Sequence, residues 1–331
     1  MHTLWVREHN RIAIKLKSMN PLWSGSRIFL TARKIVAAEI QHVLLEEWLP
    51  LVTNVDISGY NPNADPSISN IFSHAVFRFG HTLVPNQFPL YDKDFNPYTP
   101  MPVIPLREAF SNVKPVRQYG IEPILLGMMG NESEAFDTRF AEAIARHLFI
   151  PMGQGGLADL SAINIHRGRD HGLPPYTKWR QFCGFPEVKS WSDLKGEMSA
   201  QTLANLQAVY DSVHDVDIFV GGVGEFSVSE HVVGKTFGCI IGRQFKDIFD
   251  GDRHFYKNFV FTKPQYESLK NVKMYQILCD NLDGIVSLHR NPFVAFKESG
   301  HARHACITDT NSADYDGVDL EFWRDIPYNL Q

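Results

Sequence analysis

Two short segments of the chain combine residue types that bind ligands. The first, FRFGHTLV, places His81 directly after a glycine and three residues after Arg78. The second, SAINIHRGRDHGLPPY, contains Asn164 and Arg167 within a run of basic and acidic side chains. A neutral imidazole is a common metal ligand, and a guanidinium matches the planar geometry of a carboxylate. Together the two segments have the side chains to hold a metal and an acidic group.

Haem is the cofactor that these residues suit together. Its iron needs a neutral imidazole as proximal ligand, and that imidazole needs an acceptor for its other ring nitrogen, which Asn164 can supply. Its two propionates need cations, a role open to Arg78 and Arg167. Gly80, next to His81, would let the macrocycle approach the backbone closely. For either segment taken alone, a structural role is the commoner outcome: a buried ion-pair network, or a histidine packed in the core.

Other motifs give weaker signals. His301, His304 and Cys306 have side chains that bind zinc, but no fourth ligand follows at a suitable spacing, so a polar loop explains them better. The zinc-protease motif HExxH is absent, since His9 stands in REHNR without the second histidine. The glycine clusters GGLAD and GGVGE lack the Lys-Ser or Lys-Thr of a phosphate loop and are predicted to be turns.

Helices are the elements expected to position these side chains. A first helix at the start of the chain is predicted to bury Trp5, His9, Ile12 and Leu16 on one face. A second begins near Arg27, with Ser24 or Ser26 as its cap, and ends at Pro50. The inward face of this second helix is predicted to consist of Ile28, Ile35, Ala38, His42, Leu45 and Leu49.

A third helix is predicted to carry the first ligand-binding segment. Asp65 as N-cap and Pro66 in the first turn would start it, and its apolar stripe would contain Ile68, Phe72, Ala75 and Phe79. His74, Arg78 and His81 are spaced i, i+4 and i+7, so they would share another face. No useful alternating strand pattern and no internal repeat is present. The predicted fold class is therefore mostly α.

Composition excludes several classes of partner. The 331 residues are 44% hydrophobic and 21% charged, enough to bury a large core, and no linker divides them. The net charge of −5 is spread along the chain, so neither nucleic acid nor a membrane surface is expected as a partner. No run of about 18 apolar residues predicts a membrane span. The four cysteines could form two disulfides or remain free thiols, and the residues alone do not decide between these alternatives.

The chain resembles the animal haem peroxidases, the family of peroxidasin and myeloperoxidase. The resemblance runs from the first residue nearly to the last, through MHTLWVREHNRIA, RKIVAAEIQH, FRFGHTLV, LSAINIHRGRDHGLPPY, CIIGRQFKDIFDGDR and ILCDN. It implies a mostly α-helical haem peroxidase domain over residues 1–331 with haem b as cofactor. It also implies that hydrogen peroxide is reduced while a halide, or a phenolic or tyrosyl donor, is oxidised.

The resemblance also assigns roles to single residues. It implies that His81 is the proximal ligand of the haem iron and that Asn164 is the hydrogen-bond partner of His81. Arg78 and Arg167 would bind the haem propionates. By this resemblance, the four residues would form the proximal half of a peroxidase site.

Cysteine pairing and cellular setting follow from the same resemblance. The family pairs the cysteines that correspond to Cys183 with Cys239 and to Cys279 with Cys306. Two disulfides would imply an extracellular, secreted protein. The sequence Asn131-Glu-Ser is an N-glycosylation acceptor and is compatible with secretion.

The family's distal residues have no counterpart in this sequence. In the family, these residues lie upstream of the MHTLW-like helix, and Met1 of this sequence falls inside that helix. They are the distal histidine and its neighbouring glutamine, the catalytic arginine, the carboxylates that esterify the haem, and the calcium loop. We therefore expect an N-terminally truncated domain without the calcium site or covalent haem esters. The alternatives are a non-catalytic fragment or isoform that binds haem or a protein partner, and a piece of a longer peroxidase. The sequence predicts no oligomeric state.

Overall fold

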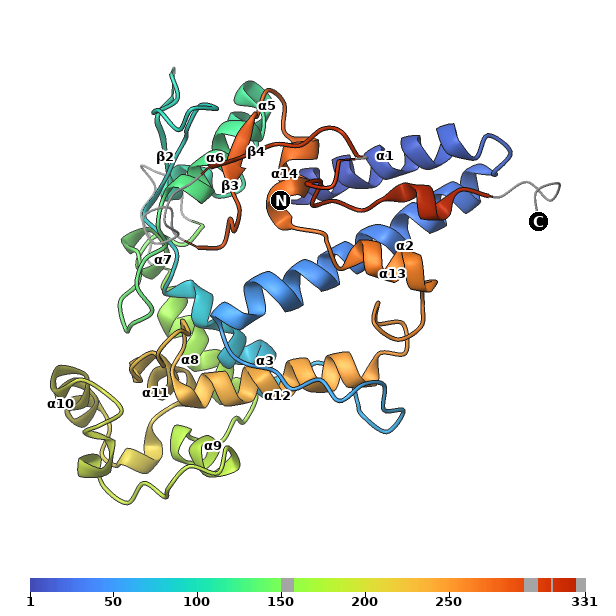
Figure 1. Cartoon of the computed structure of the whole chain (residues 1–331). Helices are drawn as coiled ribbons and strands as arrows, with labels where there is room; N and C mark the ends of the chain where they lie inside the picture. Colours follow the sequence, from blue (N-terminus) through green and yellow to red (C-terminus); the bar gives the residue numbers. More distant parts are fainter. Residues whose placement is uncertain (100, 150–157, 295–302, 311, 326–331) are drawn as a thin grey trace.

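Helices dominate the described part of the chain, which confirms the predicted fold class (Figure 1). The computed structural model describes residues 1–99, 101–149, 158–294, 303–310 and 312–325. The α-helices are α1 (His2–Met19), α2 (Gly25–Val43), α3 (Asn70–His74), α4 (Leu106–Ala109), α5 (Lys114–Tyr119), α6 (Glu122–Gly130), α7 (Glu142–Ala145), α8 (Leu160–Asp170), α9 (Tyr176–Phe182), α10 (Ala200–Val209), α11 (Ile218–Gly224), α12 (Lys235–Gly251), α13 (Lys263–Leu269) and α14 (Met274–Asn281). Shorter 3₁₀ or π turns are η1 (Leu44–Trp48), η2 (Leu49–Leu51), η3 (Val76–His81), η4 (Trp191–Leu194), η5 (Val213–Asp215) and η6 (Leu320–Trp323).

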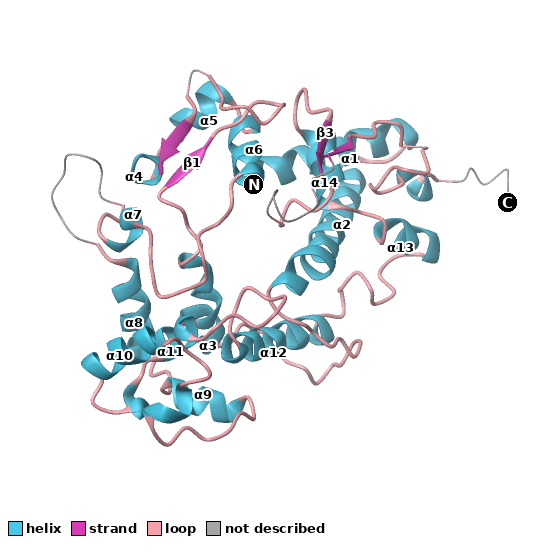
Figure 2. Ribbon diagram, turned by 60° about the vertical axis from the view of Figure 1, so that its left-hand side comes forward, coloured by secondary structure: helices cyan, strands magenta, loops and turns pink. Residues whose placement is uncertain are grey.

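Strands make a minor contribution to the described residues (Figure 2). The antiparallel pairs are β1 (Gln87–Pro89) with β2 (Val103–Pro105), and β3 (Ser287–His289) with β4 (Arg303–Ala305). Each strand is three residues long, too short to form a layer of its own. Among the described helices, none is long and apolar enough to cross a membrane.

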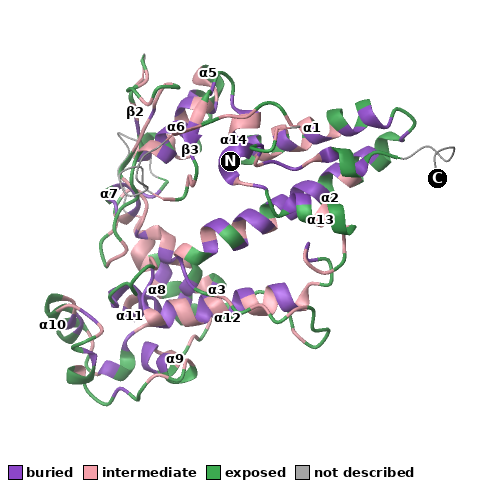
Figure 3. Cartoon of the chain, viewed as in Figure 1, coloured by how far each residue is buried: buried purple, intermediate pink, exposed green. Residues whose placement is uncertain are grey.

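The second predicted helix is confirmed in its start, its buried face and its end. The Ser24 hydroxyl accepts a hydrogen bond from the Arg27 backbone at 3.2 Å and so caps α2. The helical path continues through η1 and η2 and ends just after Pro50. All six side chains predicted to face inward are buried, and the buried stripe is visible along α2 in Figure 3.

The buried face of α1 differs from the prediction. Leu4, Glu8, Ile12 and Leu16 are buried, whereas Trp5 and His9 are only half-buried. A carboxylate therefore replaces an apolar side chain at the centre of the face. Burial of Glu8 is possible because the Arg11 guanidinium donates to it at 2.8 and 2.6 Å, and buried Asn281 donates at 2.6 Å.

The third predicted helix is wrong in its start and in its continuity. Asp65 does not cap it: its carboxylate accepts the Ser67 backbone N–H at 2.9 Å and closes a local turn instead. α3 begins only at Asn70, and the chain breaks at Ala75, which has φ −139° and ψ −68°. The 3₁₀ segment η3 then carries the chain to His81. His74 therefore lies on a different helical segment from His81.

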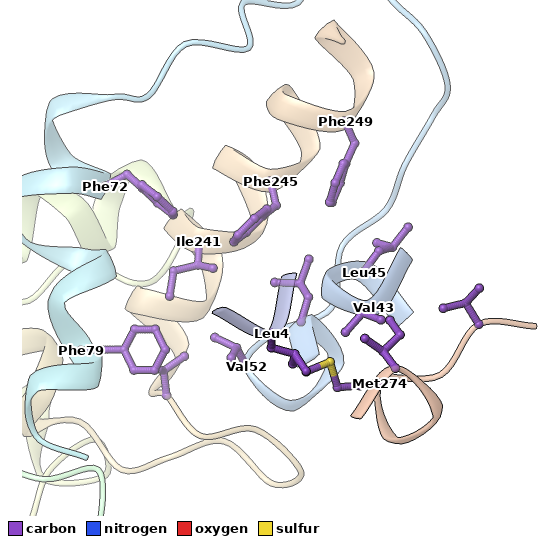
Figure 4. Close-up of a cluster of buried hydrophobic side chains, with 14 of the residues drawn as sticks. Leu4, Val43, Leu45, Val52, Phe72, Phe79, Ile241, Phe245, Phe249 and Met274 are labelled. Atoms are coloured by element: carbon purple, nitrogen blue, oxygen red, sulfur yellow. The ribbon is translucent and has the colours of Figure 1, made fainter. Parts of the chain in front are cut away.

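Aromatic packing fixes the segment that carries His81. Phe72 of α3 and Phe79 of η3 lie in a buried cluster with Ile241, Phe245 and Phe249 of α12 (Figure 4). The Phe72 and Phe245 rings meet edge to face, with centroids 5.8 Å apart. Long-range packing against α12, rather than one continuous helix, thus positions η3.

Two disulfides join segments that are distant in sequence. Cys183, just after α9, is bonded to Cys239 of α12, and Cys279 of α14 is bonded to Cys306, just after β4. These are the pairs that the family resemblance implies. Each bridge restricts the unfolded chain and so favours the folded state.

A buried histidine should make stability depend on pH. His42 of α2 is 3% exposed and its Nδ1 lies 2.8 Å from the Tyr256 hydroxyl. Burial lowers the pKa of His42 to about 4. Because the unfolded chain then takes up a proton first, stability is lost as the pH falls from about 6.5 towards about 4. The difference from an ordinary histidine corresponds to about 3 kcal/mol across this window.

Urea unfolding of the unmodified protein and of His42→Gln at a series of pH values measures this effect. The glutamine variant lacks the titrating group but keeps a polar side chain. On acidification, the unmodified protein should lose stability more steeply than the variant. Parallel pH curves for the two proteins would show that His42 does not titrate in this window.

Candidate functional site

The candidate site lies between η3 and α8. His81 is the last residue of η3, and Asn164 and Arg167 lie on α8. Asp159 caps α8, because its carboxylate accepts the backbone N–H groups of Ser161 and Ala162 at 2.8 and 3.2 Å. Three of the four predicted haem-binding residues, Arg78, His81 and Asn164, are brought into direct contact.

Asn164 connects His81 to Arg78. This side chain is completely buried, with 0% exposure. Its amide nitrogen lies 3.0 Å from His81 Nδ1, and its amide oxygen accepts a hydrogen bond from Arg78 Nη1 at 3.0 Å. Arg78 is fixed at a second point, because its Nε donates to the Ser73 carbonyl at 3.0 Å. Residues separated by more than eighty positions thus form one hydrogen-bonded chain.

The direction of the hydrogen bond between His81 and Asn164 differs from the expectation. Asn164 was expected to accept from the imidazole, but in this structure its amide nitrogen donates to His81 Nδ1. The reason is Arg78, a charged donor that forms the stronger hydrogen bond and therefore holds the amide oxygen. His81 then carries its proton on Nε2. Ligation of a metal through Nε2 would require the proton on Nδ1 and the amide turned over.

The protonation state of His81 suits a metal ligand. Burial, and then the positive charge of Arg78, lower the pKa of the imidazole below its ordinary value. The neutral form therefore predominates at neutral pH, so binding a metal through Nε2 needs a shift of the ring proton to Nδ1 but no net loss of a proton. Nδ1 is the only ring nitrogen of His81 with a hydrogen-bond partner among the described residues, which leaves Nε2 for a ligand.

Two arginines give the site an excess of positive charge. Partial burial, and then the positive charge of Arg167, lower the pKa of the Arg78 guanidinium. Within the part of the chain that the structure describes, Arg78 has no carboxylate within ion-pair distance. Arg167 is 43% exposed and lies 3.9 Å from Asp170, which is too far for a close hydrogen bond. Both guanidinium groups can therefore accept a carboxylate ligand.

The residues present fit a haem group. A Cβ added at Gly80 would meet no atom within 4 Å, so the space beside the neighbouring His81 is open. Ile163, next to Asn164 on α8, is 36% exposed, so an apolar side chain is left uncovered on this helix. A neutral imidazole, an uncovered apolar side chain and two guanidinium groups match an iron, a macrocycle and two propionates.

His74 does not join the site. Its ring stacks on that of His171, with centroids 3.6 Å apart and planes 19° apart. The break at Ala75 accounts for this, because it turns His74 away from the segment that carries His81. The polar helical face predicted for His74, Arg78 and His81 is therefore wrong for His74.

The remaining ligand candidates have structural roles. Arg169 forms a two-point ion pair with Asp217 at 2.9 and 2.7 Å, so part of the second segment is the ion-pair network given as the alternative. Cys306 is bonded in a disulfide and offers no thiolate to zinc. His304 lies on β4, and His301 lies outside the described residues. No group of three or more His, Cys, Asp or Glu side chains in the described ranges is placed to hold a metal ion.

Asn131 lies just after α6 on the surface. Its side chain is exposed and donates to the Glu132 carbonyl at 3.0 Å. An exposed sequon on a helix-terminal segment can be reached by a glycosyltransferase.

Comparison with known proteins supports the resemblance read from the motifs. The model of the animal haem peroxidase family matches residues 1–293. The peroxidasin homolog of Mus musculus is 37% identical over an alignment of 341 residues, which covers 98% of this chain and 22% of that protein. Myeloperoxidase of Homo sapiens is 37% identical over 339 residues, which cover 98% of this chain and 44% of that protein. Thyroid peroxidase of Sus scrofa is 34% identical over 340 residues, covering 99% and 36%.

Solved structures share the same fold. Peroxidase A from Dictyostelium discoideum superposes with a TM-score of 0.78 at 30% sequence identity, covering 87% of this chain and 55% of that one. A fatty acid alpha-dioxygenase from Oryza sativa superposes with a TM-score of 0.62 at 19% identity, covering 76% of this chain and 48% of that one, which is a likeness of fold alone. The chain spans less than half the length of the relatives compared by sequence.

Proposed function

The chain belongs to the animal haem peroxidase family, and from this premise we propose that residues 1–331 form a haem peroxidase domain in which His81 would hold the haem iron. The observation that carries the proposal is the hydrogen-bonded chain from Arg78 through Asn164 to His81. When bound, haem supplies the redox centre that reduces hydrogen peroxide and oxidises a halide, or a phenolic or tyrosyl donor.

The protein's own residues would hold and tune this group. His81 would present Nε2 to the iron once the ring proton lies on Nδ1, and its lowered pKa disfavours the doubly protonated ring that could not bind. Asn164 would turn its amide so that the oxygen accepts from His81 Nδ1. The same rotation would free Arg78 from Asn164, so the guanidinium could pair with a propionate, as could that of Arg167. The Asn164 amide would thus link two events, the binding of the propionates and the orientation of the His81 imidazole.

Asn164 is proposed as a positioning residue, and Asn164→Leu tests it. The leucine variant keeps the side-chain size but leaves His81 Nδ1 without its partner. Loss of such a partner typically weakens metal binding by about 10–100-fold, so haemin affinity should fall by that factor in an absorption titration. Asn205→Leu on the exposed side of α10 is the matched control and should bind as the unmodified protein does. Equal affinities for all three proteins would remove Asn164 from the site.

A second candidate function is haem binding without turnover. Splitting peroxide needs a base and a cation beside the peroxide. His74, the histidine nearest to His81 in the sequence, is stacked on His171 and so is held away from this role. This observation favours a haem-binding chain that needs further protein for catalysis.

Peroxide-dependent oxidation of a phenolic dye separates the two candidates. If the first holds, the haem-loaded chain should oxidise the dye faster than free haemin, with a rate that saturates in peroxide. A saturable haem complex with a rate no greater than that of haemin would favour the second candidate. A chain that binds no haem would contradict both.

We also propose an extracellular setting, with Asn131 glycosylated. The two disulfides and the exposed sequon support this. Expression through a secretory pathway should give a mass shift on deglycosylation that Asn131→Gln abolishes. A shift of the same size in that variant would contradict the assignment.

A further inference from the structure

A hollow of about 420 Å³ lies apart from the haem half-site, between α9, α12 and the loop that precedes α3. Trp179 and Phe182 of α9, Arg243 and Asp247 of α12, and Asp65 of the loop all line it. Small-molecule sites are typically hollows of this size with apolar walls and a few polar groups. The proposed haem chemistry uses none of these residues.

The aromatic wall of the hollow is held in place from both ends. The Trp179 and Phe182 rings meet edge to face at 5.4 Å, and Trp179 Nε1 donates to the Pro174 carbonyl at 3.1 Å. The disulfide from Cys183 to Cys239 ties the end of α9 to α12. Phe182 is nevertheless 51% exposed, so a large aromatic surface is left uncovered.

Hydrogen bonds from α12 fix the loop on the other side. Gln244 is 5% exposed, and its side-chain oxygen accepts from the backbone and the hydroxyl of Ser69 at 2.9 and 2.6 Å. Its amide nitrogen donates to the Ser67 carbonyl at 3.0 Å. Ser67 in turn donates its backbone N–H to Asp65 at 2.9 Å. The position of Asp65 relative to α12 is therefore set before any ligand binds.

The charged groups of the hollow have no ion-pair partners among the described residues. Arg243 and Asp247 are one helical turn apart on α12, yet they form no salt bridge with each other, and Asp65 pairs with no cation of the described ranges. The Arg243 guanidinium lies over the Phe182 ring, 5.3 Å from its centroid. The hollow thus presents an unpaired cation and two unpaired carboxylates beside an aromatic wall.

We propose that this hollow binds a free aromatic α-amino acid. The ring would pack against Trp179 and Phe182, the α-carboxylate would pair with Arg243, and the α-ammonium would pair with Asp247 and Asp65. A phosphate would be repelled by the two carboxylates, and a simple amine would leave Arg243 unpaired. A zwitterion with an aromatic side chain matches the aromatic wall, the cation and the two carboxylates at once.

Calorimetric titration with phenylalanine and two truncated relatives tests the chemistry, and it needs neither haem nor peroxide. Phenethylamine lacks the carboxylate, and 3-phenylpropionate lacks the ammonium. Phenylalanine should bind saturably at one site. Each relative should bind at least about tenfold more weakly, because each leaves a charged group without its hydrogen bond. No saturable binding of phenylalanine up to its solubility limit would overturn the proposal.

Two variants on α12 should change the affinities for the three ligands in opposite ways. Arg243→Gln should reduce the affinity for phenylalanine to that for phenethylamine and leave phenethylamine binding unimpaired. Asp247→Asn should weaken both ammonium-bearing ligands and spare 3-phenylpropionate. Asp211→Asn, an exposed change outside the hollow, is the control and should change nothing. Equal weakening of phenylalanine and phenethylamine by Arg243→Gln, or the same effect from Asp211→Asn, would overturn the assignment. Unchanged thermal unfolding verifies that the variants fold.

Discussion

Replacing His81 with alanine should abolish the saturable haemin binding expected of the unmodified chain. Loss of a residue that merely supports a metal ligand typically costs about 10–100-fold in affinity, so loss of the ligand itself should cost more than about 100-fold. The fold should survive, because His81 is the last residue of η3 and is only half-buried. An absorption titration that follows the Soret band measures the effect.

Matched variants separate ligation from general disturbance. His74→Ala removes a histidine from the neighbouring segment α3, and His254→Ala removes an exposed one that follows α12; both should bind haemin as the unmodified protein does. His81→Gly leaves a gap that free imidazole can fill, and added imidazole should restore the Soret band. A sharp band that saturates at one haem in His81→Ala would show that another side chain holds the iron.

The sequence predicts helices well where local rules decide them. The helical path of α2, η1 and η2 starts at the Ser24 cap and ends just after Pro50, and its inward face has the helical period along its whole length. The prediction failed between residues 65 and 81, where Asp65 satisfies a local turn and the chain breaks at Ala75. Packing of Phe72 and Phe79 against α12 decides that break, and a local pattern contains no information on α12.

The candidate site was predictable in its members but not in its hydrogen bonding. Histidine, asparagine and arginine in two segments are sufficient to suggest haem. The orientation of the Asn164 amide depends on competition between Arg78 and His81 for one oxygen, and that competition exists only after folding. The hollow beside α9 had no sequence signal, because its charged residues, such as Asp65 and Asp247, are far apart in the chain.

A second large effect is expected on stability, at a buried ion pair away from the haem half-site. Glu225, which follows α11, is 1% exposed at its side chain, and Arg180 of α9 is 3% exposed. Glu225 accepts from Arg180 at 2.9 Å and from the Tyr176 hydroxyl at 2.7 Å. It also accepts the backbone N–H of Thr236, at the start of α12, at 2.8 Å. One carboxylate therefore ties three helices together.

Glu225→Ala should lower the free energy of unfolding by about 3–5 kcal/mol. The loss comes mainly from the groups left behind: Arg180 would remain buried with only Glu197, at 3.3 Å, as a carboxylate partner. Glu225→Gln keeps the volume and part of the hydrogen bonding, so its loss should be smaller, about 1–3 kcal/mol. Urea unfolding followed by circular dichroism measures both variants.

Comparing the losses in the free energy of unfolding shows whether the buried charge of Arg180 or the packing around Glu225 dominates. If the buried charge of Arg180 dominates, Glu225→Ala is worse than Glu225→Gln, and the double variant Glu225→Ala/Arg180→Met recovers part of the stability because no unpaired charge remains. If packing dominates, the double variant is the least stable of the three. Glu187→Ala, an exposed change close to α9, should stay within about 0.5 kcal/mol of the unmodified protein. A loss below about 1 kcal/mol for Glu225→Ala would show that water reaches Arg180 and that this network does not hold α9 to α12.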